Sequence, residues 1–161
     1  MARDDRLVRL SHDHHHALVL ALRIQRELPV ADEIALGALI ADATRFWSAG
    51  LQPHIEAEND ALLNEIAPLG DEGLALAGRL QREHRELDEA MTFLRNGGRG
   101  DRSGALARFG ELLAAHIRWE ERDLLEWLEQ RLSSEALDRA HDVFAARLPS
   151  TPVVCPTPQT L

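Results

Sequence analysis

Apolar residues recur along the chain with the spacing of amphipathic helices. Close to the N-terminus, one stripe with a period near 3.5 residues is formed by Leu10, Ala17, Ala21, Ile24 and Leu28, which places these side chains on one helix face. No segment alternates apolar and polar residues with the period of two that a half-buried strand requires. Ala, Leu, Glu and Arg dominate the chain, and all four are good helix formers. The pattern predicts an all-α protein.

Proline, glycine and helix-capping residues divide this pattern into segments. The predicted helices are residues 5–28, 32–67, 71–95 and 103–132, followed by a short fifth helix that ends near residue 148. Pro53 lies inside the second segment, so we expect a kink there or a break near Gly50. Residues 96–101, Asn-Gly-Gly-Arg-Gly-Asp, form a predicted loop.

Four long helices joined by short loops predict an up-down-up-down four-helix bundle over residues 1–148. We expect the short C-terminal helix to pack on this bundle or on a second copy of the chain, so a homodimer is one expected assembly. Four prolines lie after residue 148. They predict that residues 149–161 form a disordered tail.

Three histidines fall at matching positions along consecutive predicted helices. His54, His84 and His116 each lie 14 or 15 residues from the nearest predicted turn. Antiparallel helices rise by about 1.5 Å per residue, so a difference of one residue is small beside the length of a side chain. We therefore expect these three side chains to share one layer of the bundle.

Glutamates follow two of these histidines at a helical spacing. Glu58 lies four residues after His54, and Glu120 and Glu121 lie four and five residues after His116. A spacing of four puts two side chains on the same helix face. Burying such a glutamate without a partner costs several kcal/mol, and a bound metal ion is the simplest reason to bury it.

The alternative reading of these glutamates is that they face solvent and pair with Arg118 or Arg122. In that case the histidines are hydrogen-bonded core residues without a metal.

The first predicted helix carries four histidines in five positions. His14 falls within the apolar stripe and His15 lies beside it, whereas His12 and His16 point away from it. Helical phase at about 100° per residue therefore favours His14, and then His15, as the contribution of this helix to the layer.

Composition narrows the possible partners. The net charge is −9, from 18 Lys and Arg against 27 Asp and Glu, which disfavours nucleic acid and anionic membranes. The longest apolar run, residues 17–22, is too short to span a membrane. A single cysteine, Cys155, excludes an intrachain disulfide. With no apolar signal segment at the N-terminus, we expect a cytoplasmic protein.

The order of these motifs resembles the hemerythrin-like, or HHE cation-binding, family over roughly residues 8–131. The stretches that carry the resemblance are Asp13-His14-His15, His54-Ile-Glu-Ala-Glu58, Arg82-Glu83-His84-Arg-Glu-Leu87 and His116-Ile-Arg-Trp-Glu120-Glu121-Arg-Asp-Leu124.

The resemblance implies a non-haem di-iron centre inside a four-helix bundle. The ligands that it implies are His14 or His15, His54, Glu58, His84, His116 and Glu120 or Glu121. Two carboxylates would bridge the two irons, together with an oxo or hydroxo group. Zinc or manganese also suits these nitrogen and oxygen donors. Acids around the ligands should orient the imidazoles, and the candidates are Asp13, Glu83, Asp88 and Asp123.

The chain departs from the oxygen-carrying members of that family. Those proteins have two histidines four residues apart on the third helix, whereas here Leu80 and Asp88 occupy the positions four residues from His84. They also place the fourth-helix carboxylate five residues after its histidine, which would select Glu121. A single third-helix histidine is similar to the bacterial iron-repair and eukaryotic iron-sensing branches, and it leaves an open position for O2 or NO.

Three functional hypotheses follow. The favoured one is a di-iron protein that binds or senses O2, NO or cellular iron without turnover. The second is a di-iron oxidase, a peroxidase-like enzyme or an iron-donating repair protein. The third is a metal-free helical interaction module.

Overall fold

A computed structural model of the chain describes residues 3–96 and 100–156, and within these ranges it contains helices and connecting segments but no strand. The elements are α1 (Val8–Glu27), the 3-10 turn η1 (Leu28–Val30), α2 (Glu33–Phe46), the π-helical turn η2 (Trp47–Leu51), α3 (Gln52–Ile66), α4 (Gly70–Arg95), α5 (Arg102–Trp119), the π-helical turn η3 (Glu120–Leu124), α6 (Leu125–Arg131) and α7 (Ser134–Arg147). The predicted loop 96–101 includes residues 97–99, which lie outside the described ranges.

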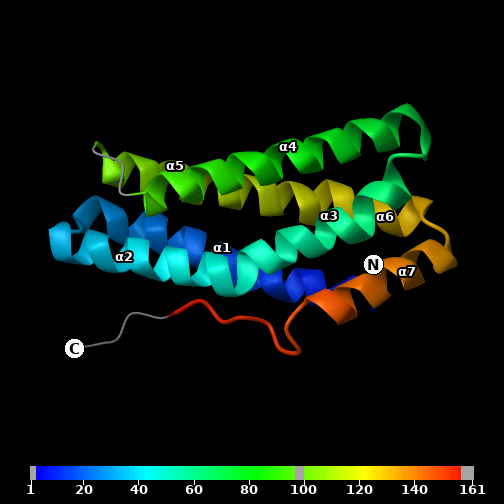
Figure 1. The fold of residues 1–161 in the computed structure, drawn as a ribbon, viewed down its shortest axis with the longest axis horizontal. Helices are drawn as coiled ribbons and strands as arrows, with labels where there is room; N and C mark the ends of the chain where they lie inside the picture. Colours follow the sequence, from blue (N-terminus) through cyan, green and yellow to red (C-terminus); the bar gives the residue numbers. More distant parts are fainter. Residues whose placement is uncertain (1–2, 97–99, 157–161) are drawn as a thin grey trace.

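The described helices form an all-α bundle, as predicted. Figure 1 shows long rods lying side by side, formed by α1, by α2 with α3, by α4, and by α5 with α6. Each rod begins at the end of the molecule where the preceding one ends. Throughout the described part of the chain, every helix is too short or too polar to cross a membrane.

Helix starts follow the capping residues of the sequence. Asp32, Asp101 and Ser133 precede α2, α5 and α7, and each side chain accepts a hydrogen bond from the backbone N–H three residues later. Such caps satisfy one of the free N–H groups at a helix start. Helix α4 begins at Gly70, whose φ of +85° is a backbone conformation that favours glycine.

Two π-helical turns interrupt the rods. In η2, the N–H of Gln52 bonds to the carbonyl of Trp47, five residues earlier. The expected irregularity at Gly50 and Pro53 is therefore a π turn within a continuous rod, and Pro53 lies in the first turn of α3, directly after it. The second π turn, η3, begins at Glu120 and was not predicted.

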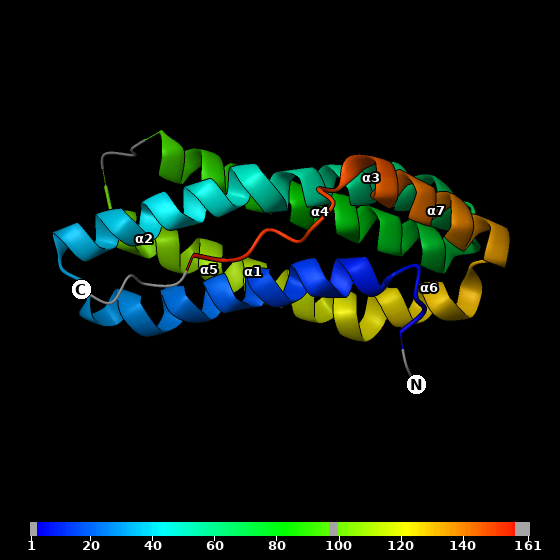
Figure 2. The same cartoon turned by 90° about the horizontal axis from the view of Figure 1, so that it is seen from below.

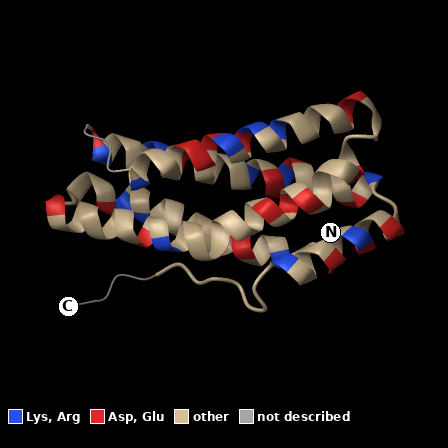
Figure 3. Ribbon diagram, viewed as in Figure 1, with Lys and Arg blue, Asp and Glu red and all other residues tan. Residues whose placement is uncertain are grey.

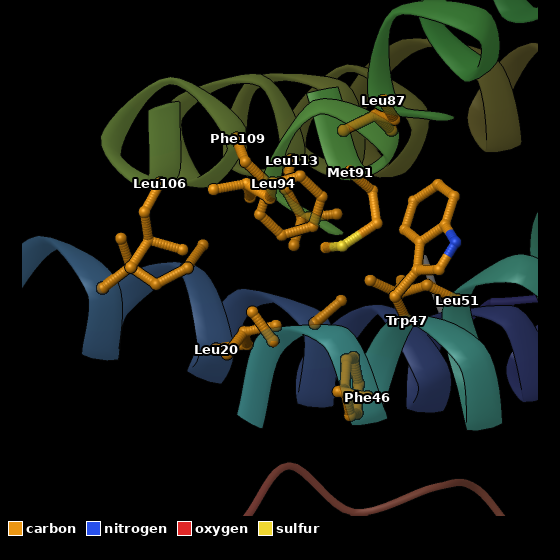
Figure 4. Packing of buried hydrophobic residues seen from close by; sticks show 14 of the residues in the cluster. Leu20, Phe46, Trp47, Leu51, Leu87, Met91, Leu94, Leu106, Phe109 and Leu113 are labelled. Carbon is orange, nitrogen blue, oxygen red and sulfur yellow. The ribbon is translucent and has the colours of Figure 1, made fainter. Parts of the chain in front are cut away.

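Two apolar clusters fill the bundle, one on each side of the histidine layer. The first contains Leu20, Phe46, Trp47, Leu51, Leu87, Met91 and Phe109 (Figure 4), and the second contains Leu10, Ala57, Leu80, Trp119, Leu128, Leu137 and Phe144. Each buried histidine lies between a residue of one cluster and a residue of the other. His84, for example, lies between Leu80 and Leu87. Water is therefore excluded from both faces of the layer.

The C-terminal elements complete the bundle. Helix α7 packs on α3 and adds Leu137 and Phe144 to the second cluster. Residues 149–156, which belong to the predicted tail, lie along the bundle without regular secondary structure and bury Cys155. They have no charged side chain to solvate, and their apolar groups pack on the first cluster. Residues 157–161 of the predicted tail lie outside the described ranges.

Candidate metal centre

Six polar side chains meet in the middle of the bundle, and every one of them is buried. They come from all four rods and are His14, His54, Glu58, His84, His116 and Glu120. The two glutamates are the least exposed of the six, at 0% and 1%. Carboxylates this deeply buried are rare in proteins unless a cation or a set of hydrogen bonds compensates them.

His14 and His54 form one half of the cluster, called here the His14–His54 pair. Their rings meet edge to face, and their Nε2 atoms lie 3.1 Å apart. Glu58 directs Oε1 toward this pair, 3.1 Å from Nε2 of His54. Glu120 directs Oε2 toward it, 3.1 Å from Nε2 of His14. Two nitrogens and two oxygens thus converge on one point.

His84 and His116 form the other half, called the His84–His116 pair, and repeat this arrangement. Their ring centroids are 4.9 Å apart, the same separation as in the first pair. Here Glu58 presents its second oxygen, Oε2, 3.3 Å from Nε2 of His84. Glu120 presents Oε1, 3.3 Å from Nε2 of His116. Each carboxylate therefore reaches both pairs with a different oxygen.

The other ring nitrogen of each histidine meets a group outside the cluster. Nδ1 of His14 lies 2.6 Å from Glu121, and Nδ1 of His54 lies 3.2 Å from Asp13. Nδ1 of His84 lies 2.9 Å from the amide oxygen of Asn59, and Nδ1 of His116 lies 2.9 Å from Glu83. An acceptor at Nδ1 fixes the ring orientation and leaves Nε2 free for a metal.

Arginines hold the outer acids in place. Arg3 contacts Glu121, Arg9 contacts Asp13, and Arg79 contacts Glu83, at 3.1, 3.2 and 2.6 Å. Arg79 also lies over the ring of Trp119. The centre is thus built in shells, with glutamates innermost, then imidazoles, then acceptors, then arginines.

The electrostatics of the six residues favour positive charge between the two glutamates. Burial alone would raise the pKa of Glu58, but the facing imidazoles, His54 foremost, hold it well below its ordinary value. Burial would likewise lower the pKa of His54 and of His84. Glu58 and Asp13 outweigh this effect at His54, and Glu120 and Glu58 outweigh it at His84, so that both pKa values rise to about 9.

The residues present fit a pair of metal ions. Both oxygens of Glu58, both oxygens of Glu120 and Nε2 of His84 are buried without a hydrogen-bond partner, and each such atom is costly unless something binds it. Two four-residue groups have ligand atoms within 4.8 Å of one another, and both include Glu58 and Glu120. Two nitrogens bound at right angles to one ion at roughly 2.1 Å would lie about 3.0 Å apart, close to the separation in the His14–His54 pair.

The structure does not bring every candidate into the cluster. His15 is exposed, because a step of one residue along α1 turns its side chain out of the core, and its ring lies beside that of His16. Glu121 lies outside the inner cluster, where it contacts the outer nitrogen of His14. Among the acids expected around the ligands, Asp13 and Glu83 contact histidines, whereas Asp88 and Asp123 are exposed.

Asn59 is the site residue that sequence reasoning missed. It lies five residues after His54 and has no charge, so neither its type nor its spacing marked it. The available signal was its place next to Glu58 on a helix whose opposite neighbour carries His84.

Comparison with known proteins agrees with this geometry. The family model described as the hemerythrin HHE cation binding domain matches residues 6–128. Comparisons with curated proteins and with solved structures gave no match. The matched region contains all six buried residues of the cluster and most of the bundle. The chain belongs to the hemerythrin HHE cation-binding domain family.

Proposed function

We propose that this protein holds two iron ions between Glu58 and Glu120 and uses them to bind or sense O2, NO or cellular iron. The observation that carries the proposal is the division of oxygens: each buried glutamate presents one oxygen to each histidine pair. A carboxylate placed between two groups of nitrogen donors is suited to bridging two cations.

The donor set fits iron and also zinc or manganese. The first ion would be held by His14 and His54, and the second by His84 and His116, with both glutamates shared. Imidazole and carboxylate ligands without a thiolate match these metals. Two irons held in this way supply a centre that binds a small diatomic molecule or changes oxidation state.

The chain itself provides orientation and a dry surrounding. The outer acceptors keep all four Nε2 atoms directed inward. The two apolar clusters above and below the layer exclude water, which strengthens electrostatic interactions inside the cluster. Each ion would have four donors from the chain, and an ion that takes more than four ligands would then bind a further small ligand.

Metal content and the optical spectrum of the protein test the proposal. Protein loaded with ferrous iron under argon should hold about two ions per chain, since each ion has its own four-residue group. Its near-ultraviolet absorption should change when O2 or NO is added. His54→Ala and His116→Ala should each lower the iron content sharply.

His16→Ala is the matched control, because His16 is also a histidine of the bundle but lies outside the cluster. Its iron content should equal that of the unchanged protein. Stoichiometric zinc without any response to O2 or NO would contradict the sensing role. An absence of metal from every preparation would contradict the metal centre and favour an interaction module.

A further inference from the structure

The C-terminal segment, residues 149–156, is fastened to the bundle at both ends. Arg9 on α1 donates a hydrogen bond to the carbonyl of Pro149, at 2.6 Å. Arg23, about four helical turns further along α1, donates to the carbonyl of Pro156. Figure 2 shows the segment in red, running between α1 and α2, and Figure 3 shows that it carries no charged residue. Cys155 is only 3% exposed.

The middle of the segment rests on a glycine of the π turn. A Cβ added to Gly50 in η2 would lie 3.0 Å from Cβ of Val153. The absence of a side chain at Gly50 therefore makes room for Val153 to pack against the π turn. The next residue, Val154, is 65% exposed. Two neighbouring valines thus differ in role: one faces the bundle and the other faces solvent.

Beneath this contact lies a small cavity next to the candidate metal centre. Its volume is about 10 Å³. Its wall includes Val153 and Pro149 from the segment, Gly50 from the π turn, and the rings of His14 and His54. A cavity needs roughly 10–15 Å³ of such volume to hold one water molecule. The space therefore accommodates a ligand no larger than about one water.

We propose that residues 149–156 cover the His14–His54 pair, and that Val153, seated on Gly50, limits the molecules that reach this pair to about the size of water. The identity of the ligand rests on the proposed function, but the cover does not. A larger molecule reaches His14 and His54 from this side only when Val153 leaves Gly50. The His84–His116 pair lies away from the segment, so its accessibility is independent of Val153.

Chemical modification of histidine in the metal-free full-length protein tests the cover. Diethyl pyrocarbonate is larger than the cavity, and mass spectrometry of tryptic peptides measures its reaction with His54 and His116 separately. Val153→Asp brings a charge to the buried side of the segment and should detach it. Modification of His54 should then become about tenfold faster or more, because local opening controls access, while His116 should change little.

Val154→Asp is the matched control, with the same substitution one residue later on the exposed side. It should leave the modification of His54 unchanged. Gly50→Val should displace the segment while leaving the sequence of residues 149–156 unchanged. It should accelerate the reaction at His54 as Val153→Asp does. Circular dichroism and the melting temperature establish that each variant is folded.

Two results would contradict the proposal that residues 149–156 cover the His14–His54 pair. One is an unchanged rate at His54 in both folded variants, Val153→Asp and Gly50→Val. The other is an equal acceleration at His54 and His116, which would mean that the segment stabilises the whole bundle rather than shielding one pair. Because the reaction uses metal-free protein, a chain that binds no iron still tests the cover. Conversely, a chain that binds two irons with no effect of Val153→Asp keeps the proposed function and loses the cover.

Discussion

The two halves of the candidate centre have the same inner donors and different surroundings. The His14–His54 pair rests on two outer carboxylates, Glu121 and Asp13, and lies under the C-terminal segment. The His84–His116 pair rests on one carboxylate, Glu83, and one neutral amide, Asn59. A groove of about 400 Å³ between α3 and α4 runs past His84 and Asn59.

The repeated His-x-x-x-Glu motif determines the inner donors of each half but not the residues around them. The His-x-x-x-Glu stretches on α3 and on α5 with η3 place one imidazole and one shared carboxylate in each half, so the inner donors are alike. The outer acceptors and the cover come from unrelated residues and make the halves unlike. We expect the two ions to differ in affinity, with the His14–His54 pair, both of whose rings contact an outer carboxylate, binding a cation more tightly.

Removing a shared carboxylate should have the largest effect, because each glutamate contacts both histidine pairs and its loss should empty both halves. In Glu58→Gln, each pair loses one anionic oxygen, and we expect less than about half an iron per chain by elemental analysis, since carboxylate ligands must be ionised to bind. Glu56→Gln, an exposed residue of the same helix, is the control. A variant that keeps one full iron would show that Glu58 serves a single half.

The pH dependence of metal affinity should be nearly as large and similar for both halves. The pKa values of His54 and His84 are raised to about 9, so these imidazoles carry a proton below that pH that metal binding must displace. Affinity should rise by about tenfold per pH unit for each proton displaced, up to about pH 9, and then level off. Competition titrations with ferrous iron at pH 6.5, 7.5 and 8.5, under argon, measure it. An affinity that does not change with pH would contradict the shared histidine ligation.

Exchanging the outer acceptors should have the smallest effect on metal affinity. It should, however, change how much the two halves differ in affinity. Asp13→Asn gives His54 a neutral acceptor and should weaken the tighter step by about tenfold. Asn59→Asp gives His84 a charged acceptor and should strengthen the weaker step by about the same factor. Stepwise calorimetric titration should show the two steps converging in either variant.

Asp88→Asn is the control for this exchange, because Asp88 is exposed and lines the groove without contacting a histidine. If the affinities of the two metal-binding steps differ as much in Asp13→Asn and Asn59→Asp as in the unchanged protein, the charge of the outer acceptors does not cause the difference between the halves.

Much of the fold could be predicted from local chemistry. Asp32 and Ser133 are capping residues whose effect depends on a few neighbouring atoms, and the structure confirms the helices that follow them. The preference for His14 over His15 followed from helical phase alone, and the structure buries His14. The matching depth of three histidines followed from rod length and short loops.

The remaining features depend on contacts between distant parts of the chain. The π turn at Glu120 adds a residue to one turn of the rod, and spacing alone left Glu120 and Glu121 as alternatives. Asn59 acquires its role only from the approach of α4. The place of residues 149–156 along the bundle depends on contacts with Gly50 and with Arg9 and Arg23 on α1, which lie far away in the sequence.

The most direct test of the central claim is an anomalous-scattering map from crystals of the full chain grown with iron. The account predicts two iron peaks between Glu58 and Glu120, one next to Nε2 of His14 and His54 and the other next to Nε2 of His84 and His116. A single peak in the cluster, or iron bound only at the exposed histidines of α1, would contradict a centre shared by the two carboxylates.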